Sequence, residues 1–191
     1  MHMNLLFATA NAHKCQEART ILGSSISIIM PSSMGFTAEI PETGLTLEEN
    51  ALQKALFIWN TFHLPCFADD TGLEVDGLDG APGVFSARYA GPSCTPADNV
   101  RKLLEEMKDM KDRTARFRCV IALIRRGEPV LFQGIVQGSI LYEPVGTGGF
   151  GYDPVFRPEG YDTSFAQMTE KEKNHISHRK RALEIMALQF T

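Results

Sequence analysis

The sequence lacks the features that mark disulfide-rich, membrane-spanning and nucleic-acid-binding proteins. Its four cysteines show no C-x-x-C spacing, which predicts thiols in a reducing cytoplasm rather than disulfides. No apolar run reaches the roughly 18 residues of a membrane span, and the opening "MHMNLLFATANAHK" lacks the basic and apolar regions of a signal peptide. The net charge of -4 argues against general nucleic-acid binding, because such domains are usually basic.

The length and the hydrophobic pattern predict one α/β domain. The chain has 191 residues, 43% of them hydrophobic, which suits a single domain over residues 1–191. Apolar runs predict strands at 4–9, 25–30, 64–68 and 73–75, and a hairpin over 115–141 that turns at 126–128. Amphipathic spacing predicts helices at about 11–22, 46–62, 96–110 and 177–190. Strands interleaved with helices favour an α/β fold with a mixed sheet.

The segment "FATANAHK" places a helix start directly after a strand. Free backbone N–H groups at a helix N-terminus attract anions, and Lys14 in the first turn adds a full positive charge. The segment therefore predicts a phosphate site, although it is not a Walker A loop. The alternative is a simple helix start, with Asn11 as its N-cap and Lys14 as a solvated surface residue.

Asp69 and Asp70 stand side by side after the apolar run 66–68, which we interpret as the end of a buried strand. Adjacent carboxylates at the edge of a core are costly without a positive partner. Side chains at the end of a parallel strand project into the crevice where α/β proteins bind ligands. Carboxylates suit Mg²⁺ carried in with a polyphosphate, and one can also take a proton from water. The alternative is a turn in which one carboxylate caps the amide of Thr71 or Gly72.

Three further segments carry polar or aromatic groups that gain meaning only in combination. On the helix over 46–62, Asn50 and Lys54 are four residues apart and share a face beside the apolar stripe, and Glu42 precedes that helix. The glycine-rich loop over 146–151 is followed by a strand-like run rather than a helix, so it is not a dinucleotide fingerprint. Its neighbouring aromatic rings can stack on a nucleobase. A basic cluster over 171–181 suits an anionic ligand better than zinc.

Taken in order, these motifs resemble those of the inosine triphosphate pyrophosphatase family, which removes deaminated purine nucleotides. The segments are "TANAHK", "ETGLTLEENALQKA", "FADDTGLEVDGLDGAPGVFSARYAG", "GTGGFGYDPVF" and "MTEKEKNHISHRKRAL". The resemblance implies an α/β fold whose long mixed sheet is flanked by helices, in two lobes with an active-site cleft between them. It also implies Mg²⁺-dependent hydrolysis of ITP, dITP or XTP to the monophosphate and pyrophosphate by a homodimer, for which 84, 85 and 89 are candidate apolar interface positions.

The resemblance also implies roles for individual residues. Asp70 would be the proton acceptor and a metal ligand, and Lys54 would face the phosphates as the second catalytic residue. Glu42 and Asp69 are further metal candidates, with Pro41 standing where relatives often carry a second acid. The substrate would be bound by Thr9, Ala10, Asn11, Ala12, His13, Lys14, Thr71, Phe150, Gly151, Tyr152, Asp153, Lys173, His178 and Arg179.

Selection of the base would depend on its 6-position. Adenine carries an amino group there and hypoxanthine a carbonyl, so donors such as His178 and Arg179 would favour the carbonyl and penalise ATP. Two other hypotheses remain open on the sequence. The protein could be a pyrophosphatase for modified pyrimidine nucleotides, or a nucleotide-binding module without turnover. The "SHR" at 177–179 argues against the first, and Asp70, Lys14 and Lys54 together argue against the second.

Overall fold

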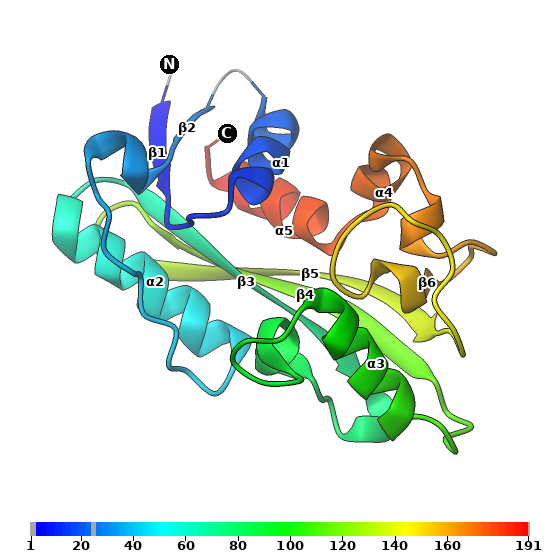
Figure 1. The fold of residues 1–191 in the computed structure, drawn as a ribbon. Coiled ribbons are helices and arrows are strands. Elements are labelled where there is room, and N and C mark those ends of the chain that lie inside the picture. Colours follow the sequence, from blue (N-terminus) through cyan, green and yellow to red (C-terminus); the bar gives the residue numbers. More distant parts are fainter. Residues whose placement is uncertain (1–2, 24–25, 191) are drawn as a thin grey trace. The chain divides into compact units, whose positions relative to one another are not determined.

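The fold is known from a computed structural model, which describes residues 3–23 and 26–190 (Figure 1). The strands are β1 (Met3–Phe7), β2 (Ile26–Ile29), β3 (Cys66–Val75), β4 (Thr114–Ile124), β5 (Pro129–Ile140) and β6 (Phe156–Pro158). The α-helices are α1 (Ala12–Leu22), α2 (Leu47–Phe62), α3 (Pro96–Glu106), α4 (Glu170–Ile176) and α5 (His178–Ala187). Short 3-10 helices lie at Pro31–Met34, Asp76–Leu78, Gly83–Arg88, Asp153–Val155, Phe165–Gln167 and Leu188–Phe190.

The strands form one mixed sheet in the order β2-β1-β3-β4-β5-β6. β1 runs parallel to both β2 and β3, whereas β5 and β6 are antiparallel. β4 and β5 are neighbours joined by only residues 125–128, too short a connection for a crossover, so they form the predicted hairpin. The prediction of an α/β fold with a mixed sheet is confirmed.

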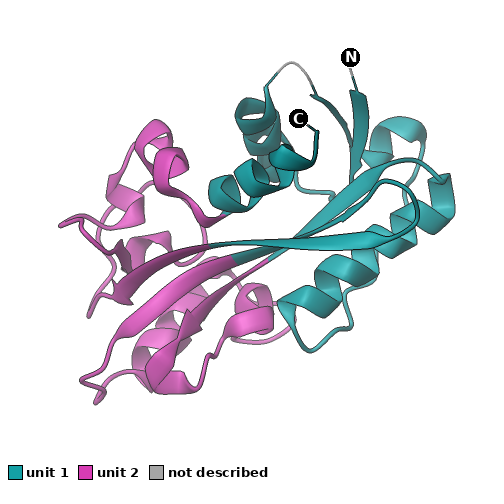
Figure 2. Cartoon of the chain, turned by 180° about the vertical axis from the view of Figure 1, so that it is seen from behind, with its two compact units in different colours: residues 1–70, 119–134, 179–191 teal, residues 71–118, 135–178 magenta. Residues whose placement is uncertain are grey.

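The chain divides into two compact units, coloured separately in Figure 2. Unit 1 comprises Met1–Asp70, Cys119–Gly134 and Arg179–Thr191, and unit 2 comprises Thr71–Arg118 and Ile135–His178. Each unit has its own hydrophobic core. The core of unit 2 collects side chains from α3, the second halves of β3 and β5, and the 3-10 segment around Phe165. The predicted cleft and the assignment of the whole chain to one domain stay predictions.

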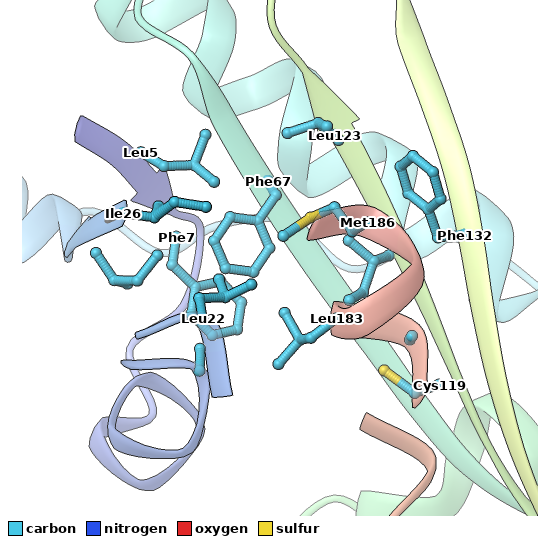
Figure 3. Close-up of a cluster of buried hydrophobic side chains, with 14 of the residues drawn as sticks. Leu5, Phe7, Leu22, Ile26, Phe67, Cys119, Leu123, Phe132, Leu183 and Met186 are labelled. Atoms are coloured by element: carbon cyan, nitrogen blue, oxygen red, sulfur yellow. The ribbon is translucent and has the colours of Figure 1, made fainter. Parts of the chain in front are cut away.

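Unit 1 is built in three layers. Helices α1 and α5 cover one face of its strands, packing residues such as Leu22 and Leu183 against Phe7 and Phe67 (Figure 3). Helix α2 covers the other face, where the Cys66 thiol donates to a carbonyl of α2 at 3.3 Å. Burial raises the pKa of that thiol to about 12, so it is held as a neutral core group. A side chain on one of these strands therefore contacts either α1 and α5 or α2, depending on the face of the sheet to which it points.

All four predicted helices are confirmed, and the structure adds a short fifth helix, α4. α1, α2 and α3 start within one residue of the expected sites, and Thr46 and Glu49 form the predicted capping box of α2. The helix expected over 177–190 is confirmed as α5, which begins at His178 and is followed by the 3-10 turn Leu188–Phe190, whereas α4 before it was not predicted. Ser177 has an extended backbone and separates α4 from α5. α4 has its own capping box, between Thr169 and Glu172, which the sequence contains but which we interpreted only as part of a charged run.

Candidate active site

The paired carboxylates lie inside a strand, not at the end of one. β3 continues without a break from Cys66 to Val75, so the prediction of separate strands at 64–68 and 73–75 was wrong, and so was the alternative of a turn at the two acids. The parallel partner β1 does end here, because its last residue Phe7 pairs with Phe67. Asp69 and Asp70 therefore extend past the carboxyl end of β1, while pairing with β4 keeps β3 extended.

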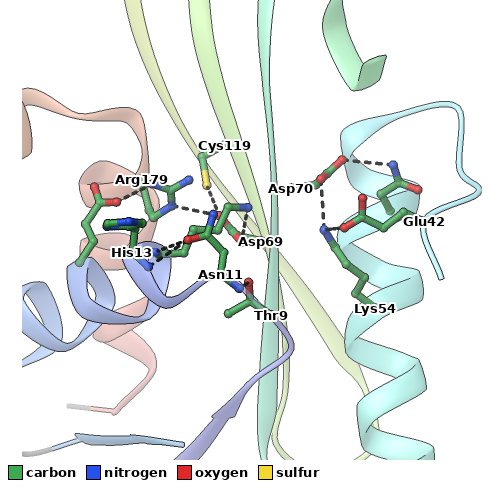
Figure 4. A network of polar contacts seen from close by, with 12 residues as sticks. Thr9, Asn11, His13, Glu42, Lys54, Asp69, Asp70, Cys119 and Arg179 are labelled. Carbon is green, nitrogen blue, oxygen red and sulfur yellow. Dashed lines mark hydrogen bonds and ion pairs between the residues drawn. The ribbon is translucent and has the colours of Figure 1, made fainter. Parts of the chain in front are cut away.

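Their adjacency on a strand sends the two carboxylates to opposite faces of the sheet, because side chains alternate along a strand. Figure 4 shows the result: Asp69 points toward α1 and α5, and Asp70 points toward α2. Both belong to the buried residues, with exposed fractions of 1% for Asp69 and 9% for Asp70. Each carboxylate therefore has its own set of partners.

Asp69 is neutralised by two cations from different helices. Lys14 Nζ lies 2.9 Å from Oδ1, and Arg179 Nε donates to Oδ2 at 3.0 Å. The Arg179 guanidinium also donates to Glu17 of α1. Burial opposes ionisation, but Lys14 and Arg179 outweigh it and hold the pKa of Asp69 below its ordinary value. We expected a metal ion as the positive partner, but the positive partners of Asp69 are the side chains of Lys14 and Arg179.

The start of α1 is both a helix N-terminus capped by Asn11 and an exposed N-terminus that could bind an anion, the two interpretations of the "TANAHK" segment. Asn11 is the N-cap, and its side-chain oxygen accepts from the backbone N–H groups of His13 at 2.9 Å and Lys14 at 3.2 Å. Thr9 Oγ1 in turn accepts from Asn11 N at 3.1 Å. Residues 10–13 are exposed, so this helix N-terminus is accessible to an anion. Lys14 is not a solvated surface residue, because Asp69 holds its ammonium group.

Asp70 meets a different group of side chains, all from α2 or the loop before it. Lys54 Nζ lies 3.1 Å from Asp70 Oδ1 and 2.6 Å from Glu42 Oε1, and Asn50 Nδ2 donates to Asp70 Oδ2 at 3.2 Å. Burial, reinforced by the nearby charge of Glu42, outweighs the attraction of Lys54 and of the more distant Lys14 and raises the pKa of Asp70. Burial works against the charge of Lys54, but Asp70, Asp69 and Glu42 prevail and raise its pKa.

The loop carrying Glu42 is held by side chains of α2. Gly44 N donates to Asn50 Oδ1 at 2.7 Å, and Leu45 N donates to the capping residue Glu49 at 2.6 Å. Gln53 exchanges two hydrogen bonds with the residue after Glu42, each of 2.8 Å. The conformation of this loop is therefore set by the helix that also supplies Lys54.

The carboxylates of Asp70 and Glu42 suit a magnesium ion. They converge on one ammonium group, which shows that their oxygens can share a cation at this point. Among residues 3–23 and 26–190, no three His, Cys, Asp or Glu side chains gather into a metal-binding group. Mg²⁺ is commonly held by one or two carboxylates and completed by substrate phosphates and water, so two carboxylates fit such a site.

In unit 2, the residues predicted from the glycine-rich loop come together around Asp153. Its carboxylate binds Lys173 and accepts from Phe150 N at 2.7 Å. Lys173 Nζ lies 4.3 Å from the centre of the Phe150 ring, which is 60% exposed. Gly149 has a φ of 71°, and a Cβ there would lie 2.1 Å from the Asp153 carboxylate. The glycine lets the loop close on Asp153 and present Phe150 outward.

The other predicted residues of unit 2 are less accessible. Tyr152 is buried and its hydroxyl donates to Ser86 O at 2.9 Å, so of the two aromatic rings only Phe150 presents an open face. Gly151 has a φ of 62°, and Thr71 is half-buried. His178 is buried and stacks on Phe117, with ring centres 5.0 Å apart.

Two residues of the networks were absent from the predicted site, Asn50 and Glu17. Asn50 and Lys54 do not merely lie beside the apolar stripe of α2 but belong to its buried positions, with Leu47, Ala51, Ala55 and Ile58. Polar residues at core positions of an amphipathic helix were the signal that could have identified them. Glu17 carries no comparable signal, because its partner Arg179 is remote in sequence.

Comparisons with known proteins give one consistent result. The model of the Ham1 family matches residues 5–189. The chain is 53% identical to the dITP/XTP pyrophosphatase of Porphyromonas gingivalis, covering 94% of this chain and 93% of that protein. It is 50% identical to the dITP/XTP pyrophosphatase of Christiangramia forsetii, covering 93% of each. Among solved structures, a HAM1 protein from Coxiella burnetii has a TM-score of 0.92 at 39% identity, over 98% of both chains.

Proposed function

Because this chain belongs to the Ham1 family, and relatives such as those of P. gingivalis and C. forsetii are named dITP/XTP pyrophosphatases, we propose that it hydrolyses dITP, ITP and XTP to the monophosphate and pyrophosphate. The observation that carries the proposal is the group around Asp70, where a buried carboxylate meets Lys54 and Glu42. Buried acids with raised pKa values are candidates for proton acceptors.

The triphosphate binds the start of α1 in this proposal. Within Thr9–His13, Ala10 and Ala12 contribute backbone N–H groups, because those of the other three residues already donate within the protein, and Lys14 contributes its ammonium group. Lys54 provides a second positive charge beside Asp70. Asp69, although a metal candidate by sequence, has both oxygens in ion pairs, so we assign it to orienting Lys14 and Arg179.

The reaction is attack of water on the α-phosphorus. Asp70 takes the proton from the attacking water, a bond forms between that oxygen and phosphorus, and the bond between the α-phosphorus and the bridging oxygen breaks, so pyrophosphate leaves. Lys14 and Lys54 stabilise negative charge on the phosphates. Asp70 and Glu42 would hold Mg²⁺, which when bound supplies charge neutralisation at the phosphates. Thr71 lies next to Asp70 along β3 and is assigned a substrate contact.

Base recognition is assigned to unit 2 and the start of α5. Phe150 stacks on the base, with Gly151, Tyr152 and Asp153 shaping the loop that carries it. Lys173, His178 and Arg179 donate hydrogen bonds to the base and sugar, including the 6-carbonyl of hypoxanthine or xanthine. Adenine would place an amino group opposite those donors, and the unpaired donors would disfavour ATP.

The proposal includes a homodimer that acts on the cytoplasmic nucleotide pool. No disulfide joins the four cysteines, all of which lie in the described part of the chain, in keeping with a reducing compartment. No helix in residues 3–23 and 26–190 is long and apolar enough to cross a membrane. Sedimentation at micromolar concentration is expected to give twice the mass of the 21.2 kDa chain.

Pyrophosphate release tests the function directly. The purified protein is incubated with Mg²⁺ and, separately, dITP, XTP, ATP or dTTP. Release is expected with dITP and XTP, with kcat/KM at least about tenfold lower for ATP and dTTP. Preference for dTTP would support a pyrimidine pyrophosphatase instead. Binding of dITP without release would support a nucleotide-binding module and would defeat the proposal.

A further inference from the structure

Asn50 is a buried amide whose two halves serve different parts of the site. Its exposed fraction is 1%, so both its carbonyl and its NH₂ group need partners within the protein. Oδ1 accepts from the backbone N–H of Gly44 at 2.7 Å, and Nδ2 donates to Asp70 Oδ2 at 3.2 Å. Reversing the amide would set two donors against each other at Gly44 and two acceptors at Asp70, so the partners fix its orientation.

This bridge connects the loop of Glu42 to the carboxylate of Asp70. Asn50 occupies Oδ2 of Asp70, which leaves Oδ1 directed at Lys54 Nζ, 3.1 Å away. The same ammonium binds Glu42 at 2.6 Å. Glu42 lies two residues before Gly44, so the bond from Gly44 to Asn50 also limits where its carboxylate can stand.

The loop must approach α2 closely for the bridge to form. A Cβ at Gly44 would lie 2.6 Å from the Cβ of Glu49 and 2.9 Å from Asn50 Oδ1. A side chain at position 44 would therefore push the loop away from Asn50. The glycine of "ETG" and the asparagine of "EENA" therefore act together, because the hydrogen bond to Asn50 depends on the close approach that Gly44 allows.

We propose that Asn50 is the positioning residue that sets the separation of Asp70 and Glu42, so that the two carboxylates together hold a divalent cation. The proposal rests on the proposed function for the use of that cation in hydrolysis. Asn50 touches neither the phosphates nor the attacking water in this assignment. It acts through Asp70 on one side and through the Glu42 loop on the other.

The chain offers a matched control in Gln53. Both residues lie on α2 and both hold the same loop, but among the described residues Gln53 hydrogen-bonds only to Thr43, and no hydrogen bond joins it to Asp70. Loss of loop anchoring alone would therefore affect Asn50→Ala and Gln53→Ala alike. Loss of the bridge would affect Asn50→Ala much more.

The experiment titrates the protein with Mn²⁺, without nucleotide, and follows binding by electron paramagnetic resonance. Asn50→Ala is expected to weaken Mn²⁺ binding about 10- to 100-fold, the usual effect of removing a residue that orients a metal ligand. The kcat for dITP should fall by a similar factor with little change in KM. Gln53→Ala should change each quantity by less than about threefold.

Two more variants guard against a general loss of folding. Asn50→Leu keeps the branched shape of the side chain and introduces a good helix former, but it removes both hydrogen bonds and should behave like Asn50→Ala. Gly44→Ala disturbs the same bridge from the loop side, and it should weaken Mn²⁺ binding as well. Thermal melting establishes which variants are folded at the assay temperature.

The outcomes separate this inference from the function itself. Wild-type Mn²⁺ affinity in a folded Asn50 variant or in Gly44→Ala would overturn the positioning role, and so would equal losses in Asn50→Ala and Gln53→Ala. Absence of Mn²⁺ binding to the wild type would overturn it too. A wild-type protein that binds Mn²⁺ but leaves dITP intact would defeat the proposed function alone, because the titration uses no nucleotide.

Discussion

Asp69 and Asp70 are chemically identical neighbours on one strand, yet the molecule treats them in opposite ways. Asp69 is fully buried between α1 and α5, with one cation on each oxygen, and its pKa is lowered. Asp70 faces α2, shares one ammonium with Glu42, and its pKa is raised. Burial acts on both, so the difference arises from the charges that each meets: only cations act on Asp69, whereas the negative charge of Glu42 opposes the cations near Asp70.

The contrast indicates how one strand can carry two acids with different roles, one that orients cations and one that accepts a proton. A carboxylate with two close cations is held ionised and exchanges protons only with difficulty, which suits the orientation of Lys14 and Arg179. A carboxylate with a raised pKa is a better proton acceptor. Pairs of acids whose surroundings push their pKa values apart commonly divide structural and catalytic roles in this manner. Alternation along β3 provides the two surroundings without any separation in sequence.

The largest effect is expected from Asp70→Asn, which keeps the shape of the side chain and removes its charge. Loss of a general base commonly costs about 10²–10⁴-fold in turnover, so kcat for dITP should fall at least about 100-fold. Steady-state pyrophosphate release measures it. The thermal midpoint should change little, because Lys54 keeps its ion pair with Glu42 when the charge of Asp70 is removed. Near-normal turnover in this variant would remove Asp70 from the chemistry.

The second test uses Asp69→Asn to ask whether Asp69 contributes more to stability than Asp70 does. Removing one member of a buried ion network leaves uncompensated charge, at a typical cost of about 3–5 kcal/mol in the free energy of unfolding. Chemical denaturation at neutral pH measures this cost. Glu17→Gln is the matched control, because it removes a partner of Arg179 but not of Lys14. If Asp69→Asn is no less stable than Asp70→Asn, the two carboxylates do not differ as described.

The third test concerns Arg179, which joins the Asp69 network to the proposed recognition of the base. Arg179→Ala is expected to lower kcat/KM for dITP about 10- to 100-fold and to lower residual activity on ATP less, since ATP lacks the 6-carbonyl. Lys14→Ala should reduce both activities alike, because the triphosphate is common to them. Equal losses on dITP and ATP in Arg179→Ala would restrict Arg179 to the ion network.

The smallest effect is expected from pH, and its sign differs between the two acids. Asp70 must be ionised to accept a proton, so kcat/KM should fall on acidification through a pKa above the ordinary aspartate value of 3.8. Asp69 has a lowered folded pKa, so its contribution to stability is present above the unfolded pKa and is lost as pH falls toward the folded one. Activity should therefore decline at a higher pH than the Asp69-dependent stability. An acid limb at or below 3.8 would contradict the raised pKa of Asp70.

The predictable parts of this structure are those with local signals. The capping residues Thr46 and Glu49 predict the start of helix α2, and two long apolar runs on either side of Gly127 predict the β4–β5 hairpin. The continuity of β3 was not predictable, because adjacent acids are poor strand formers and only pairing with β4 and side chains from three helices stabilise them there. Tertiary partners prevailed over local preference.

In the candidate site, too, the features with local sequence signals were predictable and those set by tertiary contacts were not. The residue types of the phosphate end were readable from motifs, but the distribution of Asp69 and Asp70 over two faces depended on knowing that β3 is unbroken. Asn50 could have been recognised as a polar residue at a core position of α2. Glu17 could not, since its partner Arg179 lies 162 positions further along the chain.

The bond between Arg179 and Asp69 spans 110 positions of sequence, and this separation bears on the order of folding. During synthesis β3 is available long before α5, and until α5 docks, Asp69 has one fewer cation to offset its burial. Contacts between such distant segments form slowly, because a large loop must close before they contribute. A chain that has not yet docked α5 would hold Asp69 with Lys14 as its only ion-pair partner among the described helices. The arrangement thus delays completion of the Asp69 network until α5 has been incorporated into the fold.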